Sequence, residues 1–136
     1  VNGGGWRLFD RDQPHIASAT GVLRMGRGWE LGASMRYTSG TPYTPIAGAT
    51  YDATTDVYSP RNGRLLSERN PAFFRLDLRA QKTWTFSRWS LAAYLDVQNA
   101  TNQSNAEGFS YSYDYRRRQA SNGIPILPII GLRGEL

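Results

Sequence analysis

The sequence predicts an all-β protein whose strands form an antiparallel, up-and-down meander. Apolar and polar residues alternate with a period of two in several segments, as in strands with one apolar and one wet face. Short turns and long polar connections follow these segments in strict alternation. No apolar run reaches the length of a transmembrane helix, and there is no signal peptide. The expected strands are residues 15–26, 29–38, 72–84, 89–99 and 126–136.

The first two strands are expected on either side of the tight turn Gly26-Arg27-Gly28. In residues 15–26 the odd positions are small or apolar, and the even positions include Ser18, Thr20 and Arg24. Residues 29–38 give the clearest alternation, with apolar or aromatic odd positions and mainly polar even positions. A helix would distribute these apolar residues around its whole circumference, so the pattern favours a strand.

The last three strands alternate in the same way. In residues 72–84 the exception is Lys82, which shares the apolar face with Trp84, a position from which a lysine reaches the head-group layer of a membrane. Residues 85–88 form a second short turn, and residues 89–99 alternate again. Residues 126–136 place Arg133 and Glu135 opposite the apolar residues and end without a polar tail, which we expect of a barrel's final strand.

Two long connections, residues 39–71 and 100–125, are rich in Gly, Pro, Thr, Asp and Asn. Loops of this length are uncommon in compact domains unless they are functional, whereas the outer loops of membrane barrels are often long. Residues 109–118 within the second connection are themselves strand-like and would add a sixth strand if they pair. Residues 6–13 are expected to be a polar loop.

The placement of aromatic residues favours a segment of a transmembrane β-barrel over a soluble sandwich. One group lies at the short-turn end of the strands and another at the long-loop end, like the two aromatic girdles of a membrane protein. The expected girdle residues are Trp29, Trp84, Trp89, Tyr37 and Phe74. A soluble sandwich explains the alternation but not this sorting. The negative mean hydropathy agrees with a barrel, because half of each strand is polar.

Several short motifs resemble the C-terminal strands of TonB-dependent outer-membrane receptors. They are residues 36–43 (RYTSGTPY), 70–79 (NPAFFRLDLR), 95–102 (LDVQNATN) and 131–136 (GLRGEL). The resemblance implies that residues 1–136 are the last strands of a barrel of about 22 strands in the bacterial outer membrane. The family's plug domain and TonB-contacting segment have no counterpart in these residues. The initial Val1 and the following glycines also led us to expect a piece of a longer protein.

The resemblance further implies a receptor that imports a scarce nutrient of the siderophore, cobalamin or oligosaccharide type. The implied partners are outer-membrane lipid and lipopolysaccharide, the N-terminal remainder of the barrel with its plug, and the TonB system acting through that plug. No nucleic-acid partner and no cofactor are implied. The runner-up hypothesis is a soluble antiparallel β-sheet module that binds carbohydrate or nucleic acid, although its aromatic residues face away from its arginines.

The polar face is expected to be a lumen-facing wall that carries charges of both signs. We expect an ion-pair lattice between neighbouring strands, and alternatively a surface on which a plug docks or past which a solute moves. Every basic residue except Lys82 is an arginine, and the net charge is +5. The wall residues are Glu30, Arg36, Arg75, Asp77, Arg79, Asp96, Arg133 and Glu135, and Arg24 is a further inward charge.

The candidate ligand contacts lie in the long connections. If residues 109–118 are extended, Phe109 and three tyrosines form one row, followed by three arginines. This row could offer an aromatic and basic platform to a ligand or to lipopolysaccharide phosphates, or its tyrosines could simply pack above the outer girdle. The candidates are Tyr43, Tyr111, Tyr113, Tyr115, Arg116, Arg117 and Arg118.

The sequence predicts no enzyme, with no catalytic, cofactor-binding or metal-binding residue. The single histidine, His15, has no serine and acid partners in an evident pattern. The acid pairs at 10/12 and 52/56 lack the ligand series of a calcium loop, and the glycines at 3–5 lack the context of a phosphate loop. Because about eight strands are the usual minimum for a closed barrel, we expect these five to form an open sheet.

Overall fold

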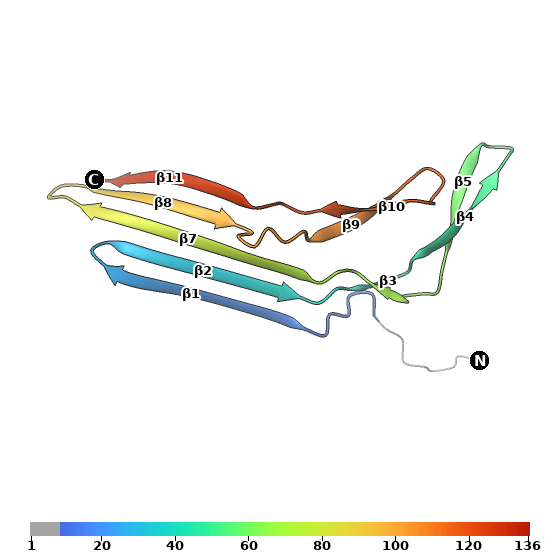
Figure 1. The fold of residues 1–136 in the computed structure, drawn as a ribbon, viewed down its shortest axis with the longest axis horizontal. Helices are drawn as coiled ribbons and strands as arrows, with labels where there is room; N and C mark the ends of the chain where they lie inside the picture. The colour runs from blue at the N-terminus through green and yellow to red at the C-terminus, as the bar shows by residue number, and fades with distance from the viewer. Residues whose placement is uncertain (1–8) are drawn as a thin grey trace.

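The computed structural model describes residues 9–136 and confirms the expected open, antiparallel meander (Figure 1). The described residues contain eleven strands and no helix. The main sheet has five strands in the order β1-β2-β7-β8-β11, and its edge strands β1 and β11 do not pair with each other. The strands are β1 (Ile16–Gly26), β2 (Trp29–Thr38), β7 (Phe73–Thr85), β8 (Ser90–Gln98) and β11 (Leu127–Glu135). Residues 1–8, including the glycines and the start of the expected polar loop, lie outside the described part.

The short turns lie together at one end of the sheet, and the long connections leave from the other (Figure 1). Gly26, Arg27 and Gly28 all have positive φ angles, of 77°, 50° and 78°, which close the β1–β2 turn tightly. The turn also contacts β7, because the Thr83 N–H donates to the Gly28 carbonyl at 2.8 Å. The β7–β8 turn is closed by the Phe86 N–H, which donates to the Trp89 carbonyl at 2.8 Å.

The long connections contain paired strands where the sequence predicted loops. In the first, β3 (Pro42–Tyr43) pairs with β6 (Glu68–Arg69), and β4 (Ile46–Asp52) pairs with β5 (Val57–Asn62). In the second, β9 (Ala106–Tyr111) and β10 (Arg118–Asn122) form a hairpin. The expectation of a single strand at 109–118 is therefore wrong. The chain turns at Tyr115, whose φ is 56°, and the Ser112 N–H donates to the Arg117 carbonyl at 3.0 Å.

The register of the main sheet places apolar rows on one face and polar rows on the other. One apolar row runs through Leu31, Ala80, Leu95 and Ile130. On this face Leu23, Leu31, Leu78 and Leu95 are 38–60% exposed, and Ile130 is 80% exposed. In the main sheet the only buried apolar residue is Ala92, which shares the other face with Arg133. The expected continuous, exposed apolar face is therefore present, and no side-chain core covers it.

We predict that Gly28→Ala destabilises the protein more than Gly26→Ala does. Both glycines have positive φ, so each alanine costs about 1 kcal/mol of backbone strain. A methyl group at Gly28 would also lie 2.1 Å from the Thr83 carbonyl oxygen, whereas at Gly26 it would meet nothing within 4 Å. Urea unfolding followed by tryptophan fluorescence measures both variants. Equal losses in the free energy of unfolding would contradict the close approach of this turn to β7.

Candidate functional site

The polar face of the main sheet carries four ion pairs. Two cross between strands, Arg24 to Glu30 and Arg79 to Asp96, each at 3.0 Å. The other two each join two residues of a single strand: Arg75 to Asp77 on β7 at 2.8 Å, and Arg133 to Glu135 on β11 at 3.2 Å. All are partly or largely exposed, and such pairs contribute about 0–1 kcal/mol each.

The expected ion-pair lattice is therefore only partly cross-strand. Arg36 lies opposite Arg75 in the register, so a cross-strand pair of opposite charges is not available there. The Arg75 guanidinium instead contacts Asp77, two residues along its own strand. Residues i and i+2 share a face of a strand, which makes this alternative pairing possible.

An aromatic side chain extends this polar network to the edge strand. The Arg79 guanidinium lies 4.5 Å from the centre of the Tyr94 ring, and its Nη2 donates to Gln81 at 2.9 Å. Tyr94 lies opposite Gly131, where an added Cβ would be 2.2 Å from the ring. The glycine thus leaves the space that the tyrosine fills. The sequence analysis did not select Tyr94, because a single tyrosine in an alternating strand carries no further signal.

Two buried asparagines hold the second long connection in place: Asn105 attaches it to β7, and Asn99 joins its two legs. Beyond the end of β8, the Asn105 side chain accepts from the Phe74 N–H at 2.9 Å and donates to the Phe74 carbonyl at 2.8 Å. The Asn99 amide donates to the Gln103 and Ile124 carbonyls, both at 3.0 Å. Asn105 thus pairs with the β7 backbone at Phe74, beyond the last residue pair of β7 and β8, and Asn99 brings the chain before β9 close to the chain after β10.

A cluster that we call the loop latch joins the two long connections. It consists of Tyr43, Glu68, Phe109 and Arg118, one residue each from β3, β6, β9 and β10. The Arg118 guanidinium donates to the Tyr43 hydroxyl, which in turn donates to the Glu68 carboxylate. The guanidinium also lies 4.4 Å from the Phe109 ring centre, and the Tyr43 and Phe109 rings are 5.7 Å apart.

The latch changes the protonation behaviour of its tyrosine. The hydrogen bond to Glu68 and partial burial raise the pKa of Tyr43 above its usual value, and this outweighs the opposing effect of Arg118. The hydrogen bond to Tyr43 raises the pKa of Arg118, which remains charged. Tyr43 and Arg118 are candidates from the sequence, whereas Glu68 lies in a polar stretch without periodicity and is not.

A second cluster, the tyrosine cluster, lies between the β4–β5 hairpin and the β9–β10 turn. The Tyr58 ring lies 4.9 Å from Tyr51 and 5.5 Å from Tyr113. The Tyr51 hydroxyl donates to the Asp56 carboxylate at 2.9 Å, which raises the pKa of Tyr51, and the Tyr113 hydroxyl donates to the Asp56 carbonyl. A hollow of about 390 Å³ lies beside it. The hollow is lined by Ile46, Ala47, Gly48, Ala49, Tyr58, Asp114, Tyr115 and Arg116.

The seven candidate loop residues are therefore divided between sites. Tyr43 and Arg118 belong to the latch, Tyr113 packs on Tyr58 in the tyrosine cluster, and Tyr115 and Arg116 line the hollow. Tyr111 packs against Tyr115 with ring centres 6.0 Å apart, and the Arg117 N–H donates to the Ser112 hydroxyl at 3.0 Å. The expected single aromatic row is wrong, because the turn separates Phe109 and Tyr111 from the later tyrosines. The Ser112 hydroxyl also donates to Asp114 at 2.5 Å, which lowers the pKa of Asp114.

Aromatic residues lie at both ends of the apolar face. At the short-turn end, the Lys82 ammonium is 5.5 Å from the Trp29 ring centre and 5.8 Å from that of Trp84. Trp89 stacks on Phe86 with ring centres 4.4 Å apart. At the long-loop end, Tyr37 and Phe74 are direct register partners.

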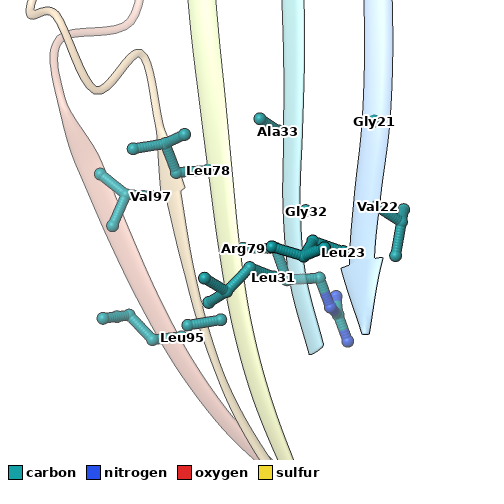
Figure 2. Close-up of a pocket in the computed structure, with 11 residues that line it drawn as sticks. Gly21, Val22, Leu23, Leu31, Gly32, Ala33, Leu78, Arg79, Leu95 and Val97 are labelled. Carbon is teal, nitrogen blue, oxygen red and sulfur yellow. The ribbon is translucent and has the colours of Figure 1, made fainter. Parts of the chain in front are cut away.

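Between these ends, the apolar face is hollowed (Figure 2). We call this feature the apolar hollow; its volume is about 690 Å³. It is lined by Gly21, Val22, Leu23, Leu31, Gly32, Ala33, Leu78, Arg79, Ala80, Leu95 and Val97. The small side chains among these leave the space that the leucines surround.

Other site types receive no support from residues 9–136. These residues hold no group of three or more His, Cys, Asp or Glu side chains that could bind a metal ion. The same part of the chain has no helix long and apolar enough to cross a membrane.

We predict that Arg118→Gln loosens the β9–β10 hairpin and that Arg117→Gln does not. The first change removes the stack on Phe109 and the hydrogen bond to Tyr43. If the free energy of local opening falls by about 1 kcal/mol, local amide exchange becomes roughly fivefold faster. Hydrogen exchange at residues 106–122 and 68–69 measures the effect. Unchanged exchange in Arg118→Gln would show that the latch does not hold the connections together.

We also predict that the latch weakens at alkaline pH. Because the pKa of Tyr43 is raised, its contribution to stability is present below the ordinary tyrosine pKa of about 10 and is lost as pH rises through the folded-state value. Tyrosinate absorbance in the protein and in Tyr43→Phe gives the titration of Tyr43 by difference. A Tyr43 titration midpoint at or below the ordinary tyrosine pKa would contradict the hydrogen bond to Glu68.

Comparison with known proteins gives no match: no family model, curated protein or solved structure is found to be similar to this chain. The functional assignment therefore depends on the chemistry of its sheet faces, turns and loop clusters.

Proposed function

We propose that this chain forms part of the wall of a bacterial outer-membrane β-barrel of the TonB-dependent receptor type. In this proposal the barrel imports a scarce nutrient, such as a siderophore, a cobalamin or an oligosaccharide. The plug of the barrel and the TonB system that acts through it would be supplied by other residues. The apolar face of the main sheet would contact lipid, and the polar face would line the lumen.

The single observation that carries the proposal is the continuous apolar face across five strands, opposite a face of ion pairs. Soluble monomers rarely expose contiguous apolar patches larger than a few hundred Å². In a bilayer the same face meets hydrocarbon, and the ion-paired face meets water in the lumen. A soluble binding module would need another surface to cover the leucines and tryptophans of all five strands.

The two ends of the sheet support the same orientation. Tight turns at one end and long, folded connections at the other correspond to the periplasmic and extracellular ends of such barrels. Trp29 and Trp84 lie at one end of the apolar face, and Tyr37 and Phe74 at the other. Aromatic side chains favour the two membrane–water interfaces, where their polar atoms reach water.

The open edges are consistent with a larger barrel. An unpaired strand edge in hydrocarbon leaves backbone N–H and C=O groups without partners, at several kcal/mol each. β1 and β11 are such edges in the main sheet. In the proposed barrel further strands pair with both of them.

The long-loop end offers the surface for ligand contact. The hollow beside the tyrosine cluster combines the Tyr58 and Tyr115 rings with the charges of Asp114 and Arg116. Aromatic faces with adjacent polar groups suit a ligand that is both ring-shaped and polar. Exposed arginines of the same connection, including Arg117, suit the phosphates of lipopolysaccharide.

We predict that Leu31→Arg and Leu78→Arg impair membrane insertion of the intact barrel. A cation on the lipid face near mid-membrane depth costs about 2–4 kcal/mol. The matched controls are Ser34→Arg and Gln81→Arg, which lie on the polar face of the same two strands. Urea-dependent folding into liposomes measures the cost for all four variants.

Labelling of single cysteines gives a second test, because the sequence contains no cysteine. In the inserted protein, Leu31→Cys and Leu78→Cys should resist a water-soluble maleimide, whereas Ser34→Cys and Gln81→Cys should react. Equal sensitivity of both faces in either experiment would contradict the orientation. If the 136-residue chain were a monodisperse soluble monomer without detergent, the membrane proposal would fail for these residues.

A further inference from the structure

One charged side chain interrupts the apolar face, and it lies next to the apolar hollow. Lys82 on β7 is the only charged residue in the apolar rows of the five main strands. On the same face of β7, Ala80 and Leu78 precede it by two and four residues, which is about 7 and 13 Å along the strand. Both residues line the hollow. The Lys82 cation thus lies at the short-turn end of the apolar hollow.

The Lys82 ammonium is held in place rather than extended freely into solvent. It lies 5.5 Å from the centre of the Trp29 ring and 5.8 Å from that of the Trp84 ring, within the range of cation–π attraction. It also donates to the Arg27 carbonyl oxygen of the β1–β2 turn. An ammonium group has three N–H donors, so this bond leaves two for an acceptor outside the protein.

The hollow has the size and chemistry of a site for a hydrocarbon chain. Its volume of about 690 Å³ lies within the usual range for small-ligand sites. Its lining consists of glycine, alanine, valine and leucine, apart from Arg79, whose guanidinium pairs with Asp96. Each buried methylene group of an acyl chain contributes about 0.8 kcal/mol to transfer from water. A second copy of this sheet packed over the hollow would instead cover the Lys82 ammonium with apolar surface, which is unfavourable.

We propose that Lys82 and the apolar hollow form a binding site for one phospholipid of the leaflet at the short-turn end. The lipid phosphate accepts hydrogen bonds from the Lys82 ammonium, and one acyl chain lies along the hollow. Trp29 and Trp84 flank the ester region, where tryptophan side chains are favoured in membranes. This inference rests on the proposed membrane location of the barrel and adds a specific lipid ligand to it.

The test uses the intact barrel, extracted from membranes in mild detergent, freed of lipid and titrated with palmitoyl-oleoyl-phosphatidylglycerol. Native mass spectrometry counts the bound lipids and the protein copies. Two further titrations separate the parts of the ligand: a diacylglycerol with the same chains lacks the phosphate, and inorganic phosphate lacks the chains. The phospholipid should bind much more tightly than either.

Four variants identify the site. Lys82→Gln removes the charge, and Gly21→Leu fills the hollow at a position where an added Cβ meets nothing within 4 Å. Each should weaken phospholipid binding about tenfold, as expected for loss of a charge-assisted hydrogen bond or of a buried chain segment. Lys82→Arg should restore binding. Arg88→Gln removes a cation from the neighbouring short turn, outside the apolar rows, and should leave binding unchanged.

The outcomes separate this inference from the proposed function. If the wild-type protein is not recovered from membranes, the proposed function fails and the lipid site fails with it. If the protein is recovered and folded, but diacylglycerol binds equally well or Lys82→Gln has no effect, only the lipid site is wrong. Equal weakening by Lys82→Gln and Arg88→Gln would indicate general charge attraction and would also overturn the site. A wild-type dimer that is absent in Gly21→Leu would overturn the lipid site as well.

Discussion

The backbone hydrogen-bond ladder between the five main strands is the constraint on which the rest of the structure depends. In the main sheet only Ala92 is a buried apolar residue, so packing in a side-chain core cannot hold these strands together. Because side chains alternate, the register of the ladder also decides which residues share a face. A slip of one residue between β2 and β7 would move Leu31 into the polar rows and Ser34 into the apolar rows. The tight β1–β2 turn and its bond to Thr83 oppose such a slip.

The sequence predicted the main sheet closely because its signal is local. The bounds of β2 agree with those expected, since the period of two in residues 29–38 is nearly uninterrupted. The small hairpins were missed because glycine, proline and threonine in residues 46–62 obscure any alternation. The turn within residues 109–118 was missed because aromatic residues continue through it, although Tyr115 leaves the extended conformation.

Residues of the candidate site could be predicted from the sequence only where the type of a single residue indicates a binding role. Tyr43 and Arg118 were selected by residue type, but their contact joins positions 75 apart in sequence, and no periodicity connects them. Asn105 was not selected, because pairing of its side-chain amide with both backbone groups of Phe74 depends on where β8 ends. Lys82 was selected beside Trp84, whereas its bond to Arg27 depends on how the β1–β2 turn lies against β7.

The anchoring of the β9–β10 hairpin by asparagine side chains affects what a ligand must do in order to bind there. Fixing the backbone of a flexible loop costs about 1–2 kcal/mol of conformational entropy per residue. Here Asn105 holds the connection on β7, Asn99 joins the two legs of the connection to each other, and Arg118 holds the hairpin against the first connection. That ordering cost is met during folding of the chain. A ligand that contacts Tyr58 and Tyr115 therefore meets a preorganised surface, and more of its contact energy remains as affinity.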